Sequence, residues 1–218
     1  FIADELPSDY LTIISIKMMT TIKCGHLFLN RTVRVTQPWL RLFLTTKSLV
    51  IRPVQVTDAR AYLCFLNQVV QETPFLPIAA ENLAMSEAFC ELTLRAVLDS
   101  STDALWVAVD GAKIVGAARL VSEPEPGLQH IGEISVAVLK TYWRQKIGTQ
   151  LLDALLQATS ASGQPRRIVL TVQARNQGAI QLYQQFGFQI EAKLEAGYYD
   201  PAVGMLPVLQ MVRLINIE

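Results

Sequence analysis

Two basic residues and a glycine lie close together at Arg144, Lys146 and Gly148, where a loop becomes an amphipathic helix. The first N–H groups of a helix have no acceptor within the helix, and the helix dipole favours an anion beside them. Gly148 leaves room for a phosphate to approach the backbone, and Thr149 adds a hydroxyl. The pattern predicts a phosphate site at this helix start; an ordinary solvent-exposed helix start is the alternative.

The elements that would position this helix start follow one another regularly from Ser48 onward. Apolar residues recur at strand or helix spacing. We expect strands over residues 48–55, 104–110, 113–122, 130–140, 166–173, 188–196 and 207–215, and helices over residues 58–71, 87–100, 148–162 and 176–186. Ser86 and Asn176 are expected N-caps, Asp110–Gly111 a tight turn, and Tyr198–Tyr199 part of a loop. Helices between strands in both halves of the chain predict a mixed α/β layer fold.

The composition indicates a folded domain without general affinity for polyanions. Of 218 residues, 51% are hydrophobic and 17% charged, and 19 basic residues balance 19 acidic ones. The zero net charge argues against nucleic acid or an anionic membrane as partner. Cys24, Cys64 and Cys90 form no cluster with metal-ligand spacing, so we expect no metal and a reducing, cytoplasmic location.

Residues 1–46 differ from the rest, because their short apolar runs keep no sustained helical or strand period. We expect a poorly ordered N-terminal extension there, followed by one domain over residues 47–218; a small element packed on the domain is the alternative for the extension. The apolar run Leu11–Ile16 is too short to span a membrane and follows acidic residues, so we expect neither a membrane span nor a secretory signal.

Two segments carry a resemblance to a known family: ISVAVLKTYWRQKIGTQLL, residues 134–152, and NQGAIQLYQQFGF, residues 176–188. They resemble the pyrophosphate motif Q/R-x-x-G-x-G/A and the segment N-x-x-A-x-x-L-Y-x-x-x-G-F of the GNAT superfamily of N-acetyltransferases. The second segment keeps every specified residue. In the first, Trp143 replaces Q/R and Lys146 replaces the first glycine. Lys146 can donate its N–H to a phosphate if its φ is negative, and its side chain could swing out and pair with a phosphate. The alternative is that Lys146 crowds the loop and weakens coenzyme binding.

The resemblance implies a mixed, mostly antiparallel sheet of six to seven strands flanked by helices on both faces, and acetyl-CoA as co-substrate. The strand before the loop would splay from its neighbour and bind the pantetheine arm through the backbone of Val136, Ala137 and Val138. The remaining coenzyme contacts that it implies are Arg144, Lys146, Ile147, Gly148, Thr149 and Asn176.

The resemblance also implies acetyl transfer to a primary amine by direct attack in a ternary complex. Tyr183 matches the family's usual acid, which protonates the leaving thiolate; a core tyrosine bonded to backbone is the alternative. Glu133 is the candidate base, because it shares a strand face near the acetyl group and an ammonium must lose a proton before attack. A cross-strand ion pair or a solvated carboxylate is its alternative, and His130 is a second candidate base.

The acceptor is expected to be a small-molecule amine or a protein or peptide amine. The first helices, the Pro74–Pro77 loop and the Tyr198–Tyr199 loop would contact it. Glu72, Glu81 and Glu87 would attract a cationic amine, or are ordinary surface carboxylates. A GNAT-like domain that binds an acyl-CoA without turnover is the competing function, and the family resemblance allows a homodimer. The absence of GxGxxG after the first strand argues against a dinucleotide-binding fold.

Overall fold

The computed structural model describes residues 49–76 and 84–215; the expected extension over residues 1–46, and Glu81, lie outside the described residues. In chain order the elements are β1 (Leu49–Pro53), a short 3-10 helix η2 (Val56–Asp58), α1 (Ala59–Glu72), α3 (Glu87–Asp99), β2 (Ala104–Asp110), β3 (Lys113–Ser122), β4 (Ile131–Val138), a short 3-10 helix η3 (Lys140–Tyr142), α4 (Ile147–Ser162), β5 (Arg167–Gln173), α5 (Gln177–Gln185), β6 (Gln189–Asp200) and β7 (Gly204–Leu214). The sequence predicts this order of strands and longer helices.

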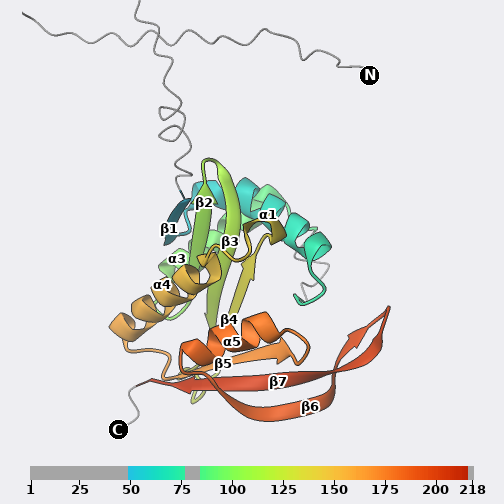
Figure 1. Cartoon of the computed structure of the whole chain (residues 1–218). Coiled ribbons are helices and arrows are strands. Elements are labelled where there is room, and N and C mark those ends of the chain that lie inside the picture. The colour runs from blue at the N-terminus through green and yellow to red at the C-terminus, as the bar shows by residue number, and fades with distance from the viewer. Residues whose placement is uncertain (1–48, 77–83, 216–218) are drawn as a thin grey trace, which may run out of the picture. The chain divides into compact units, whose positions relative to one another are not determined.

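The strands form one seven-stranded sheet in the order β1-β2-β3-β4-β5-β7-β6 (Figure 1). All neighbouring pairs are antiparallel except β4 and β5, which run parallel. This confirms the expected mixed, mostly antiparallel sheet. The parallel pair is joined by α4, because a parallel connection needs a crossover.

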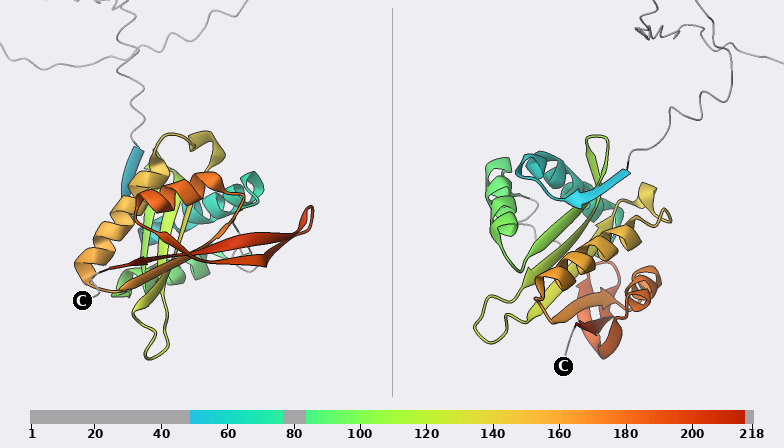
Figure 2. Two further views of the ribbon diagram at one scale, coloured as in Figure 1. Left: turned by 60° about the horizontal axis from the view of Figure 1, so that its bottom comes forward. Right: turned by 90° about the vertical axis from the view of Figure 1, so that its left-hand side faces the viewer.

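Helices cover both faces of the sheet, as expected (Figure 2). On β3, Gly116 faces α4, since a Cβ at this glycine would lie 3.0 Å from Leu151 Cδ1. The next residue along the strand, Ala117, faces the side of α1 and α3, because strand side chains alternate. The inward face of α4 is the predicted set of buried leucines, Leu151, Leu152, Leu155 and Leu156. Burial of each leucine contributes roughly 1.5–3 kcal/mol.

Local sequence signals start two helices and form one tight turn where expected. The Ser86 side chain accepts a hydrogen bond from Phe89 N–H at the start of α3. The Asn176 side chain accepts one from Ala179 N–H at the start of α5. Gly111, in the turn between β2 and β3, has a φ of 64° that glycine adopts without strain.

One local prediction is wrong: Tyr198 and Tyr199 lie within β6, not in a loop. Their partners on β7 are Leu206 and Met205, and the register shifts between Leu194 and Tyr198. The glycine at 197 marks this irregularity rather than the end of the strand. Pairing with β7, which is not visible in local sequence, carries the strand through it.

The parallel strands β4 and β5 separate along their length. They pair only through Ile131–Glu133 and Arg167–Val169. Beyond these residues β4 remains paired with β3 and β5 with β7. The splay that the family resemblance implies is therefore present, and it opens a gap between two strands in the middle of the sheet.

Candidate active site

The loop before α4 contains two residues with left-handed backbone. Arg144 has a φ of 62° and Lys146 a φ of 59°. Lys146 is the N-cap of α4, and its carbonyl accepts the first helical hydrogen bond, from Gln150 N–H. The condition of a negative φ at Lys146 is therefore not met. The left-handed conformation explains why the motif carries glycine there, because a side chain in this region adds strain.

The start of α4 still offers hydrogen-bond donors. The N–H groups of Ile147, Gly148 and Thr149 lie in the first turn, where a helix provides no acceptor. The Arg144 and Lys146 side chains are exposed and have no ion-pair partner among the described residues. Both cations are thus available to an anion at this helix start.

Gly148 lies beside the gap between β4 and β5. A Cβ at this position would lie 3.4 Å from Leu182 Cδ2 on α5 and 3.9 Å from Val138 Cγ2 at the end of β4. The missing side chain therefore points into the space between the end of β4 and α5. A long side chain here would enter the opening of the gap.

The edge of β4 that faces the gap carries backbone groups of alternate residues. Leu139 N–H donates to the Val115 carbonyl of β3. Backbone groups of successive strand residues point to opposite sides, so Ala137 faces β3 while Val136 and Val138 face the gap. Of the three residues predicted to bind the pantetheine arm through backbone, Val136 and Val138 have the required direction. Ala137 instead contributes its side chain to a cavity.

Trp143 has a contact that the sequence did not suggest. Its indole Nε1–H donates to the Val138 carbonyl at 2.7 Å. This bond holds the Lys140–Trp143 turn against the end of β4. The tryptophan at the motif's Q/R position thus fixes the loop that precedes α4.

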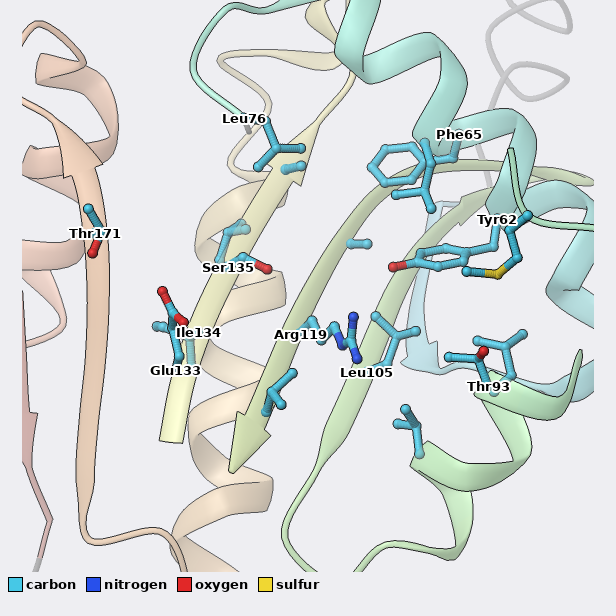
Figure 3. Close-up of a pocket in the computed structure, with 18 of the residues that line it drawn as sticks. Tyr62, Phe65, Leu76, Thr93, Leu105, Arg119, Glu133, Ile134, Ser135 and Thr171 are labelled. Carbon is cyan, nitrogen blue, oxygen red and sulfur yellow. The ribbon is translucent and has the colours of Figure 1, made fainter. Parts of the chain in front are cut away.

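A cavity of about 620 Å³ lies on the α1 and α3 side of the sheet and reaches the gap (Figure 3). Helix residues such as Tyr62 and Phe65 form one wall, and β3, β4 and β5 contribute Arg119, Glu133 and Thr171. Leu76, Met85 and Tyr198, from or near the segments predicted to contact the acceptor, also line it; Pro77 of the predicted loop lies outside the described residues.

Tyr183 lines the same cavity from α5. It is 6% exposed, and its ring packs edge-on against Phe188 at 5.8 Å between centroids. Among the described residues its hydroxyl has no hydrogen-bond partner, so the alternative of a hydroxyl bonded to backbone is not what the structure shows. Burial raises the pKa of Tyr183 to about 12, which keeps the phenol protonated at neutral pH.

Glu133 also reaches the cavity, from the last paired position of β4 and β5. Its side chain is exposed, and it forms no ion pair within the described part of the chain. The alternative of a cross-strand ion pair therefore does not apply. His130 is exposed just before β4 and does not line the cavity.

Comparison with known proteins identifies the family. Residues 70–188 match the acetyltransferase (GNAT) family. The chain belongs to the GNAT family.

Individual relatives agree with this assignment. The chain is 30% identical, over 148 residues, to a protein named as the uncharacterized N-acetyltransferase YycN of Bacillus subtilis; the match covers 65% of this chain and 93% of that protein. A GNAT acetyltransferase structure from Streptococcus pneumoniae superposes with a TM-score of 0.74 at 33% identity, covering 77% of this chain and all of that one. YncA of Salmonella typhimurium, whose structure holds acetyl-CoA, shares the fold with a TM-score of 0.68 at 18% identity, covering 78% and 96%.

In this GNAT protein a polar network that sequence reasoning missed borders the cavity through Gln173. Buried Gln173 donates from Nε2 to the Pro74 carbonyl at 2.8 Å and accepts from Arg175 Nε at 2.8 Å. Arg175 also pairs with Asp200 at 2.7 Å and lies over the Phe75 ring. The network ties the loop after α1 to β5 and β6. A buried glutamine in an apolar strand, RRIVLTVQ, is the one sequence signal for it.

Glu72 and Glu87, two of the carboxylates predicted to attract the acceptor, do not line the cavity. Glu72 accepts hydrogen bonds from Lys140 N–H and from Gln68, both at 2.6 Å, so it joins α1 to the turn after β4. These bonds lower the pKa of Glu72. Glu87 lies at the exposed start of α3 and does not line the cavity.

No described helix has both the length and the apolar character needed to cross a membrane.

We expect Lys146→Gly to stabilise the protein. A left-handed non-glycine residue costs roughly 1–2 kcal/mol, while the greater freedom of glycine in the unfolded chain offsets about 0.5–1 kcal/mol. The free energy of unfolding, measured by urea denaturation, should rise by about 0.5–1 kcal/mol. Lys140→Gly is the matched control. Lys140 lies in the 3-10 helix η3, where glycine is unfavourable, so this substitution should destabilise the protein. A loss of stability in Lys146→Gly would contradict the left-handed loop.

Proposed function

We propose that this chain transfers an acetyl group from acetyl-CoA to a primary amine by direct attack in a ternary complex. One observation carries the proposal. The gap between β4 and β5 has the donor-rich start of α4 at its end, and it opens into a cavity lined by Tyr183 and Glu133. The chain's membership of the GNAT family and the acetyl-CoA bound by YncA support this assignment.

The coenzyme would lie along the gap. Its pyrophosphate would accept hydrogen bonds from the N–H groups of Ile147, Gly148 and Thr149, with Arg144 and Lys146 adding positive charge. The backbone groups of Val136 and the N–H of Val138 would pair with the amides of the pantetheine arm, as a peptide adds to a sheet edge, while the Val138 carbonyl is bonded to Trp143. The Asn176 side chain caps α5 through its oxygen, which leaves its NH₂ group for the coenzyme.

The reaction removes two protons from the acceptor nitrogen and adds one to the leaving thiolate. Glu133 would accept a proton from the ammonium of the acceptor, directly or through water, because an alkylamine with a pKa of about 10 is charged at neutral pH. The amine nitrogen then attacks the thioester carbonyl carbon; a C–N bond forms and the C–S bond breaks. A gap-facing N–H, such as that of Val136, would stabilise the oxyanion. The thiolate leaves with the proton of the Tyr183 hydroxyl. The new amide nitrogen loses its second proton through water to the Tyr183 phenolate, and Glu133 releases its own proton to solvent.

An acyl-CoA-binding domain without turnover is the second candidate function. The observation that favours it is the pair of non-glycine residues, Arg144 and Lys146, in left-handed conformation in the phosphate loop. Their side chains limit how closely a phosphate approaches. Such a protein would bind the coenzyme and acetylate no amine.

Calorimetric titration with acetyl-CoA, beside CoA and NAD, tests the proposed coenzyme. We expect acetyl-CoA and CoA to bind and NAD not to bind, because the gap offers an edge to the pantetheine amides that NAD lacks. Failure of acetyl-CoA to bind would overturn both candidate functions.

We expect Glu133→Gln to lower the acetylation rate at pH 7 by about 10²-fold, because the amide cannot accept the proton. The deficit should shrink as the pH approaches about 10, where the amine is already neutral. Rates from pH 6 to 10 measure this, and Glu125→Gln in the exposed loop before β4 is the control. A deficit that stays constant with pH would contradict the role of base.

A further inference from the structure

The cavity on the α1 and α3 side of the sheet contains a positively charged side chain that the proposed mechanism does not use. Arg119 projects from β3 into the cavity (Figure 3). Its Nε is fully buried and has no hydrogen-bond partner, and its guanidinium forms no ion pair among the described residues. A buried donor without a partner is unfavourable, because it has lost its hydrogen bonds to water. A charged group left in this state inside a binding cavity indicates that a ligand supplies the acceptor.

A second free donor lies beside it. Tyr62, on α1, lines the cavity and stacks on Phe65 at 6.2 Å between centroids. Its hydroxyl has no hydrogen-bond partner within the described residues, and Figure 3 shows it directed toward Arg119. Burial raises the pKa of Tyr62, so the hydroxyl is a neutral donor at physiological pH. A guanidinium and a phenol that converge in an apolar cavity match a carboxylate.

The cavity carries opposite charges that do not neutralise each other. Arg119 lies opposite Ser135 on β4, and Glu133 is one diagonal step away on the same face. Diagonal neighbours in a sheet are about 7–8 Å apart. Figure 3 shows the Glu133 carboxylate directed toward the β5 side and Arg119 toward Tyr62. A zwitterion bound between the two side chains would present its ammonium to Glu133 and its carboxylate to Arg119.

We propose that the acceptor is a small amino acid whose carboxylate binds the Arg119 guanidinium and the Tyr62 hydroxyl while its amine meets Glu133. The inference rests on the proposed acetyl transfer and names its substrate class. Phe65, Leu66 and Leu94 form apolar walls of the cavity, which suit an apolar amino-acid side chain. The product is the N-acetyl amino acid, which loses the ammonium but keeps the carboxylate.

The test compares matched acceptors with acetyl-CoA as donor. L-Leucine and L-phenylalanine are each assayed beside their carboxamide and their decarboxylated amine, with a glutamate-initiated tripeptide amide as a further acceptor. The wild-type kcat/KM should favour each amino acid over its two counterparts without a carboxylate by about 10²-fold, since hydrogen bonds to a charged group are the strong ones. In Arg119→Met this preference should fall to nearly one, and in Tyr62→Phe by about tenfold.

Lys113→Met is the control variant, because it removes the same charge from an exposed end of β3 and should keep the preference. Equal kcat/KM for the amino acids and for the amines without a carboxylate, or a preference for the acidic peptide, would overturn the amino-acid proposal and leave acetyl transfer intact. Acetylation of none of these acceptors or of any other amine would overturn the proposed function and this inference with it. The wild-type comparison needs no variant, so it stands if Arg119→Met does not fold.

Discussion

Tyr183→Phe should lower the rate of acetyl transfer by about 10²-fold or more while leaving the affinity for acetyl-CoA nearly unchanged. The variant removes only the hydroxyl, which has no protein partner among the described residues, and keeps the ring packed on Phe188. The departing thiolate then has no positioned proton donor. Single-turnover rates and calorimetric titration with acetyl-CoA separate the two quantities.

The pH dependence is a second readout of the same residue. The acid must be protonated to act, and burial raises the pKa of Tyr183 to about 12. An ordinary tyrosine loses its proton near a pH of about 10. Because the pKa of Tyr183 is raised, activity that depends on its proton should be retained through that pH and lost only as the pH approaches the pKa of Tyr183. Tyr199→Phe, at an exposed position on β6, is the control. An unchanged rate in Tyr183→Phe would remove it as the acid.

Gly148→Glu should abolish measurable binding of acetyl-CoA. The new side chain would start 3.4 Å from Leu182 and extend into the opening of the gap, where its charge repels the pyrophosphate at the start of α4. We expect the affinity to fall by about 10²-fold or more, as judged by calorimetry, since both a charge-assisted contact and space are lost. Thermal unfolding checks that the variant is folded.

Two further substitutions at this position separate charge from bulk. Gly148→Ala adds a Cβ at ordinary contact distance and should bind acetyl-CoA nearly as the parent does. Gly148→Gln adds a side chain of the size of glutamate without its charge. Its affinity for acetyl-CoA should lie between those of Gly148→Ala and Gly148→Glu. Undiminished binding by Gly148→Glu would mean that the coenzyme does not use this helix start.

Much of the fold is predictable from the sequence because its signals are local. The leucines of α4 recur at helical spacing, Asp110–Gly111 suits a tight turn, and Asn176 caps α5 through its own side chain. Tyr198 is the contrasting case. Its strand exists because β7 pairs with it across an irregular register, and that contact is distant in sequence.

Some residues of the candidate site were predicted from the sequence, and others were visible only in the structure. The segment that contains Tyr183, and the strand face of Glu133, follow from motif and alternation, and the structure brings both residues to one cavity. The sequence left the sign of φ at Lys146 open: the glycine that the motif carries there points to left-handed backbone, whereas a lysine does not. Arg119 was missed. Its signal is a charged residue on the inward face of KIVGAARLVS, between Ala117 and Val121, but only the packed helices show that this face borders a cavity.

The most direct test of acetyl transfer is product analysis with a broad panel of amines, including free amino acids and peptides. Purified protein is incubated with acetyl-CoA and each amine, and mass spectrometry detects the acetylated amine while a thiol assay detects released CoA. We predict release of CoA in equal amount to an N-acetylated product, and loss of both in Tyr183→Phe. Binding of acetyl-CoA without acetylation of any amine in the panel would contradict the account and would identify a coenzyme-binding domain without turnover.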